Sequence, residues 1–140
     1  MGESCGVIYI EAVSPEEAAA ACSELHSSAR TKFLVTPSLN GWCAVYPSAA
    51  GQDVGVSLQL AQRLRRSTLH VLLHDSDVLA YVLYRDGEAI DEFNSAPDYF
   101  GEVSAAERER QRGDAALLVA TLATGVEASA VAAVLAASRR

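Results

Sequence analysis

The stretch VIYIEAVSPEE, residues 7–17, joins a strand pattern directly to a helix start. Its first five residues are rich in β-branched and aromatic side chains, which favours an extended strand. Ser14 can cap a helix, Pro15 suits the first helical position, and Glu17 stands three residues after the cap. This spacing predicts a capping box and a helix that runs to about residue 29.

Four further elements follow this β-α unit. Residues 33–36 and 42–46 predict two strands, and Asn40-Gly41 between them favours a turn with positive φ. A second helix is expected to begin at Gln52 or Asp53 and to lead into an apolar strand at 69–74. The resulting order, β-α-β-β-α-β, is that of a ferredoxin-like split βαβ core.

A β-meander extends this core. Residues 78–84 and 88–93 predict two more strands, and the Asp86-Gly87 pair between them is typical of a type I′ hairpin turn with Arg85 and Glu88 opposite each other. The expected fold class is therefore α+β, with a mostly antiparallel sheet. If the first strand and helix are set aside, the remaining order ββαβββα also fits profilin-like or longin-like domains, and the sequence leaves both topologies open.

Two C-terminal helices are expected at 115–123 and 127–137, with Gly125 at their turn. The strands at 69–73 and 78–83 are apolar at odd and even positions, so both faces of the sheet need a cover there. The helical hairpin, about residues 114–138, would supply it on the face opposite the first two helices. A homodimer or a ligand groove would satisfy the same pattern.

Length and charge limit the classes of function. A chain of 140 residues, half of them apolar, fits one α+β domain over residues 1–140. A net charge of −7 disfavours nucleic acid and anionic membrane surfaces as partners and suits a basic protein. We expect a monomer or a homodimer.

Cysteine usage and the chain ends point to the cytoplasm. Three cysteines without a C-x-x-C spacing indicate neither a disulfide framework nor a zinc knuckle. The N-terminus has no pattern of an export signal. The apolar C-terminal stretch is interrupted by Gly125 and Glu127, which argues against a membrane span.

One short segment could carry metal or acid–base chemistry. His74, Asp75 and Asp77 surround the turn between two predicted strands, where they could hold a hard cation or supply a general base. Aspartates at a strand end are also ordinary turn residues, and we favour that interpretation. No P-loop, G-x-G-x-x-G or G-x-S-x-G pattern occurs, so we expect neither cofactor nor catalytic residue.

The favoured function is therefore a non-catalytic protein–protein interaction or regulatory module. Its expected surface is an acidic, aromatic meander formed by Asp75, Asp77, Tyr84, Asp86, Asp98 and Tyr99. Two alternatives stay open. One is a metal-assisted hydrolase that uses His74, Asp75 and Asp77, and the other is a small-ligand sensor with an apolar groove under the C-terminal helices.

Short motifs in the middle of the chain support a resemblance. They include Gly41-Trp42, His74-Asp75-Ser76-Asp77, Tyr84-Arg85-Asp86-Gly87 and Pro97-Asp98-Tyr99-Phe100-Gly101. Over roughly residues 41–101 the chain resembles a set of uncharacterised bacterial proteins without an established activity. The resemblance implies a cytoplasmic bacterial protein and no catalytic residue.

Overall fold

The computed structural model describes residues 2–25, 31–48, 51–122 and 126–139. Its elements in chain order are β1 (Cys5–Glu11), α1 (Pro15–Ser23), β2 (Phe33–Val35), β3 (Trp42–Pro47), α2 (Val54–Leu64), β4 (Thr68–His74), β5 (Val78–Arg85), β6 (Glu88–Asn94), α3 (Ala105–Arg110), α4 (Ala115–Leu122) and α5 (Ala128–Ser138).

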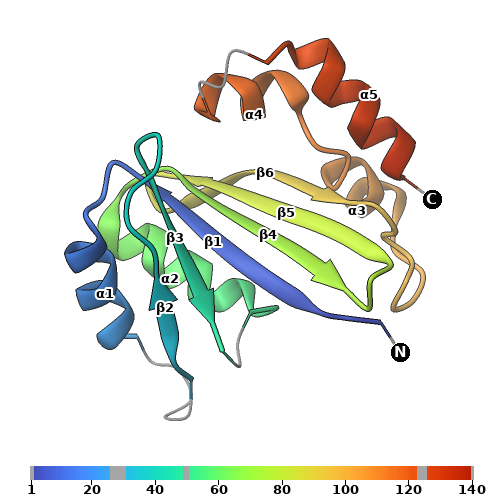
Figure 1. The fold of residues 1–140 in the computed structure, drawn as a ribbon. Coiled ribbons are helices and arrows are strands. Elements are labelled where there is room, and N and C mark those ends of the chain that lie inside the picture. The colour runs from blue at the N-terminus through green and yellow to red at the C-terminus, as the bar shows by residue number, and fades with distance from the viewer. Residues whose placement is uncertain (1, 26–30, 49–50, 123–125, 140) are drawn as a thin grey trace.

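The six strands form one open sheet in the order β2-β3-β1-β4-β5-β6 (Figure 1). Every neighbouring pair is antiparallel. The expected α+β class with an antiparallel sheet is confirmed. The order of the whole sheet differs from that of a four-stranded ferredoxin-like sheet, since β5 and β6 continue it beyond β4.

The predicted capping box opens α1. The Glu17 N–H donates to Ser14 Oγ over 3.1 Å, and the Ser14 N–H donates back to Glu17 Oε1 over 3.5 Å. The helix ends at Ser23, earlier than expected. The Glu24 N–H bonds to the Ala21 carbonyl, which tightens the last turn and closes the helix. Residues 26–29 of the predicted helix lie outside the described residues.

The predicted hairpin turns are confirmed. Asn40 and Asp86 both have positive φ and each precedes a glycine that also has positive φ. Arg85 and Glu88 pair across the second turn in register, yet they form no ion pair among those described. The Arg85 guanidinium instead donates to Thr121 Oγ1 over 3.0 Å, because α4 brings that acceptor over the end of β5.

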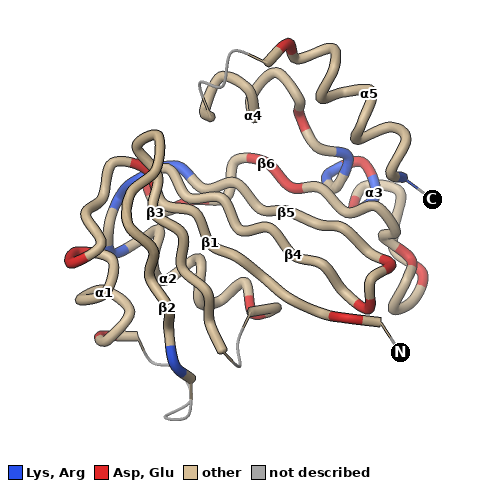
Figure 2. Tube along the Cα trace, viewed as in Figure 1, with Lys and Arg blue, Asp and Glu red and all other residues tan. Residues whose placement is uncertain are grey.

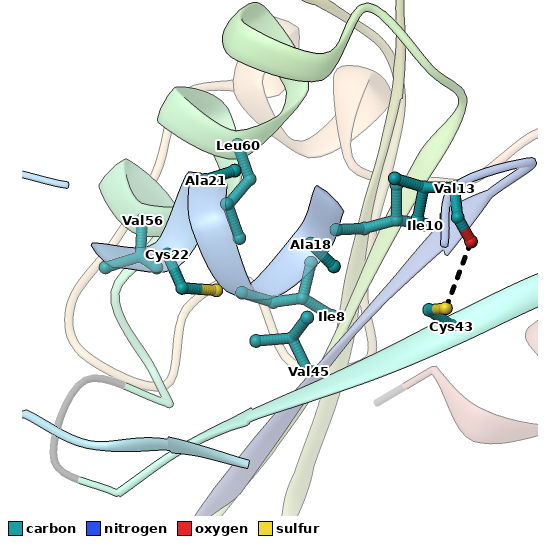
Figure 3. Close-up of a cluster of buried hydrophobic side chains, with 10 residues drawn as sticks. All are labelled: Ile8, Ile10, Val13, Ala18, Ala21, Cys22, Cys43, Val45, Val56 and Leu60. Carbon is teal, nitrogen blue, oxygen red and sulfur yellow. Dashed lines mark hydrogen bonds between the residues drawn. The ribbon is translucent and has the colours of Figure 1, made fainter. Parts of the chain in front are cut away.

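One hydrophobic core lies between the sheet and the pair α1 and α2. Side chains at alternate positions of β1 and β3 meet small residues of α1, which let the helix lie close to the sheet (Figure 3). Cys43 belongs to this core, and its thiol lies 3.2 Å from the Val13 carbonyl oxygen. Burial also raises the pKa of Cys22 to about 11. These two cysteines are therefore buried core residues.

A second core lies on the opposite face, under the C-terminal helices. Leu135 of α5 and partly buried leucines of α4 pack against Leu69, Tyr81, Leu83 and Phe93. The prediction that the C-terminal hairpin covers this face is thus confirmed for β4, β5 and β6. Gly125, its expected turn residue, lies outside the described residues. Of the helices in the described parts, none is both long and apolar enough to cross a membrane.

Candidate functional site

An exposed group of aromatic and acidic side chains lies at the end of the sheet where β4 turns into β5. Phe100 is 78% exposed. Its ring packs edge-on against His74 at 4.8 Å and against Tyr99 at 4.9 Å between centroids. We call this group the acidic aromatic patch and define it as His74, Asp75, Asp77, Asp98, Tyr99 and Phe100.

The patch is held by the N-terminal segment and by the loop after β6. The Gly2 N–H donates to Asp75 Oδ1 over 2.6 Å, and the Tyr99 hydroxyl donates to Asp75 Oδ2 over 3.2 Å. The Asp75 N–H in turn donates to Ser4 Oγ over 2.9 Å. Two segments that are distant from Asp75 in sequence therefore hold this residue, so the neighbouring rings are presented on an ordered support.

Asp98 anchors the loop that carries the two rings. Its carboxylate accepts from the Val103 N–H over 3.0 Å and pairs with Arg108 of α3. The Val103 N–H and the Arg108 guanidinium lower the pKa of Asp98 below its ordinary value. Figure 2 shows acidic residues on the β4–β5 turn, on the loop after β6 and near the N-terminus. The patch therefore combines an exposed ring with an acidic setting.

Two of the predicted surface residues lie elsewhere. Asp86 sits in the β5–β6 turn, at the other end of β5 from Asp75 and Asp77. A strand of eight residues spans about 26 Å, so Asp86 is not a neighbour of these two carboxylates. Tyr84 is 2% exposed and lies under α2, with its hydroxyl 3.0 Å from Ser57 Oγ. The structure therefore brings Asp75, Asp77, Asp98 and Tyr99 together at one end of the sheet and places Asp86 and Tyr84 apart from them.

A buried network of hydrogen bonds joins the side chains of Ser57, His70 and Tyr84. No local sequence motif predicts it. His70 is fully buried, with Nδ1 2.7 Å from Ser57 Oγ and Nε2 2.8 Å from the Gly51 carbonyl oxygen. Because a carbonyl can only accept, Nε2 carries the proton and Nδ1 accepts from the Ser57 hydroxyl. Burial lowers the pKa of His70, against the opposing effects of the Gly51 hydrogen bond and the Asp53 charge. This hydrogen-bond network stabilises a neutral histidine in the core.

The proposed metal ligands do not converge. Among the residues that the structure describes, no three His, Cys, Asp or Glu side chains gather closely enough to hold an ion. The ring of His74 lies edge-on to Tyr99 and Phe100, and Asp75 is engaged by Gly2 and Tyr99. The turn therefore gives no support to metal-assisted hydrolysis by these three residues.

A groove of about 980 Å³ opens on the half of the sheet that α4 and α5 leave uncovered. Three aromatic side chains, Tyr9, Trp42 and Tyr46, line it. Sequence analysis did not single them out. The available signal was the alternation Trp42, Ala44, Tyr46, which places aromatic residues on one face of a single strand.

The comparisons with known proteins add no identity. A scan of protein-family models, a search of curated proteins and a search of solved structures each found no match.

Proposed function

We propose that the protein is a non-catalytic binding module that recognises a basic protein segment through the acidic aromatic patch. The observation that carries this proposal is Phe100, a large apolar side chain that is 78% exposed and braced by His74 and Tyr99 beside carboxylates. Exposed aromatic anchors ringed by polar groups are typical of binding hot spots. The carboxylates would attract a basic partner and favour its orientation.

Capture from the cytoplasmic extract of the source cell tests this proposal. The immobilised protein should retain a partner that the Phe100→Ala variant loses. The control is Val134→Ala, which truncates an exposed apolar residue of α5 outside the patch and should still retain the partner. Asp77→Asn should weaken capture, whereas Asp86→Asn, at the far end of β5, should not. Capture should also decline in about 0.5 M salt, where surface charges are screened. If the Phe100→Ala variant retained the partner equally well, the patch would be excluded as the binding surface.

A second function is favoured by the groove. Its volume of about 980 Å³ falls in the range of small-molecule sites, and its lining is largely apolar and aromatic. We infer that the groove can hold a small ligand, as expected for a sensor. A saturable change in the fluorescence of Trp42, the sole tryptophan, on addition of a small ligand would support this function.

We also infer that β1 to β4 with α1 and α2 form a ferredoxin-like core within a single domain. The order β2-β3-β1-β4 supports this, because β3 lies between the two strands that α1 connects. The central place of β1, bonded to β3 on one side and β4 on the other, supports this core over a profilin-like or longin-like one, in which β1 would be an addition.

A further inference from the structure

The groove is formed by the sheet, one hairpin and one helix. Its floor is the face of β1, β3 and β4 opposite α1 and α2, and Leu122 of α4 stands at one side. The hairpin between β2 and β3 forms another side through Thr36, Pro37, Leu39 and Asn40. Walls on more than one side make this a concave site for a compact molecule.

Strand register brings the aromatic residues together. Tyr9 pairs with Ala44, and Glu11 pairs with Trp42, on neighbouring antiparallel strands. Trp42 and Tyr46 flank Ala44 on the same face of β3, so both are diagonal neighbours of Tyr9. The pKa of Tyr9 is raised by burial and by Tyr46, in keeping with this proximity. The small Ala44 lies among these three large rings, and all four residues line the groove.

The charge of the groove is negative. Glu11 is half-buried there, and none of the ion pairs within the described parts of the chain includes it. No lysine or arginine is among the described residues that line the groove. Aromatic faces attract cations, and a half-buried carboxylate adds to that attraction. Anionic ligands such as nucleotides would find no counter-charge on this lining.

We propose that this groove binds a small organic cation, with Tyr9, Trp42 and Tyr46 around its alkylammonium group and Glu11 as the counter-charge. The inference rests on the small-ligand function proposed above. A quaternary ammonium group suits the site because it is bulky, weakly hydrated and positively charged.

Trp42 reports on this site directly. The fluorescence of the full-length protein is titrated with choline and, separately, with 3,3-dimethylbutan-1-ol, which has the same shape but a carbon in place of the charged nitrogen. Sodium chloride at equal ionic strength is the salt control. We expect saturable binding of choline and at least about tenfold weaker binding of the neutral alcohol.

Variants locate the binding in the groove. Glu11→Gln is expected to weaken choline binding about tenfold with little effect on the alcohol. Tyr46→Leu should also weaken choline binding about tenfold with little effect on binding of the alcohol. Glu16→Gln, which removes an exposed carboxylate of α1 outside the groove, should change neither affinity. Thermal midpoints of the variants are recorded, and Tyr46→Leu serves as the test if Glu11→Gln does not fold.

The outcomes separate the two proposals. Equal affinity for choline and the alcohol would overturn the cation inference and leave the small-ligand function standing. Saturation by neither probe would overturn both. A peptide with a trimethyllysine that binds more than about tenfold tighter than choline would replace the free cation with a protein segment as occupant.

Discussion

His70 is a titratable side chain kept inside the core by hydrogen bonds. Its two ring nitrogens are both satisfied, one by Ser57 and one by the Gly51 carbonyl. Ser57 Oγ also lies 3.0 Å from the Tyr84 hydroxyl. Buried polar groups destabilise a protein mainly when they are unpaired. The three side chains can therefore stay in the core as long as each keeps its hydrogen-bond partner.

Removal of the middle member should therefore destabilise the protein. Ser57→Ala leaves His70 Nδ1 without its partner and deprives the Tyr84 hydroxyl of a close one. We expect a loss of about 1–3 kcal/mol in the free energy of unfolding, measured by urea titration. Ser129→Ala, at an exposed position of α5, is the control and should stay within about 0.5 kcal/mol. A Ser57→Ala protein as stable as the control would contradict the hydrogen-bonded chain.

The stability of the protein should also depend on the charge of His70. Its pKa in the folded state is lowered, whereas in the unfolded state it is about 6.5. Between these two values the unfolded state binds more protons, so stability falls as the pH drops below about 6.5. Urea midpoints at a series of pH values should show this loss, and His70→Gln should abolish it. Asp98 acts in a different pH window, since its lowered pKa affects stability only below the ordinary pKa of 3.8.

At the scale of elements, glycines fix how the segments join. Gly113 connects α3 to α4 with φ of +77°, and a Cβ there would lie 2.9 Å from Tyr81 Oη and 3.2 Å from Leu135 Cδ1. Gly41 has a similar φ of +83°, but a Cβ there would meet nothing within 4 Å. A side chain would meet the same unfavourable backbone conformation at both positions, but it would be crowded only at Gly113. The two glycines therefore form a matched pair for substitution.

Gly113→Ala should be clearly more destabilising than Gly41→Ala. The left-handed backbone costs each alanine about 1–2 kcal/mol, and overpacking at Gly113 adds about 1–3 kcal/mol. Urea denaturation of the two variants gives the difference directly. Equal losses would mean that α4 and α5 shift away from β5 and β6 without cost.

At the scale of the whole molecule, the two faces of the sheet are covered unequally. Helices α1 and α2 close one face, while α4 and α5 cover only part of the other (Figure 1). The C-terminal helices contact the sheet through a small set of apolar side chains. Leu135 is 8% exposed, whereas its neighbour Val134 is 61% exposed.

Truncation of these two neighbours should have very unequal effects on stability. Leu135→Ala is expected to cost about 2–5 kcal/mol, because it empties a site against Tyr81 and Phe93. Val134→Ala should stay within about 0.5 kcal/mol. Thermal or urea unfolding measures both, and an environment-sensitive dye should bind the Leu135→Ala protein more strongly. A small effect of Leu135→Ala would show that α5 contributes little to the fold.

The sequence by itself determined the elements and their turns. The Ser14 capping box and the Asn40 and Asp86 turns depend on groups within four residues of each other, so local geometry decides them. The apolar pattern of β4 and β5 likewise indicated a cover on both faces, because such strands are buried on both sides.

Only the tertiary structure decided which residues share a site. Successive turns of an antiparallel meander lie at opposite ends of the sheet, which separates Asp86 from Asp75. Strand alternation places Tyr84 and His70 on one face, but the packing of α2 decides that this face is buried against Ser57. The groove depends on how far α4 and α5 extend across the sheet, and that is set by long-range packing that no local pattern encodes.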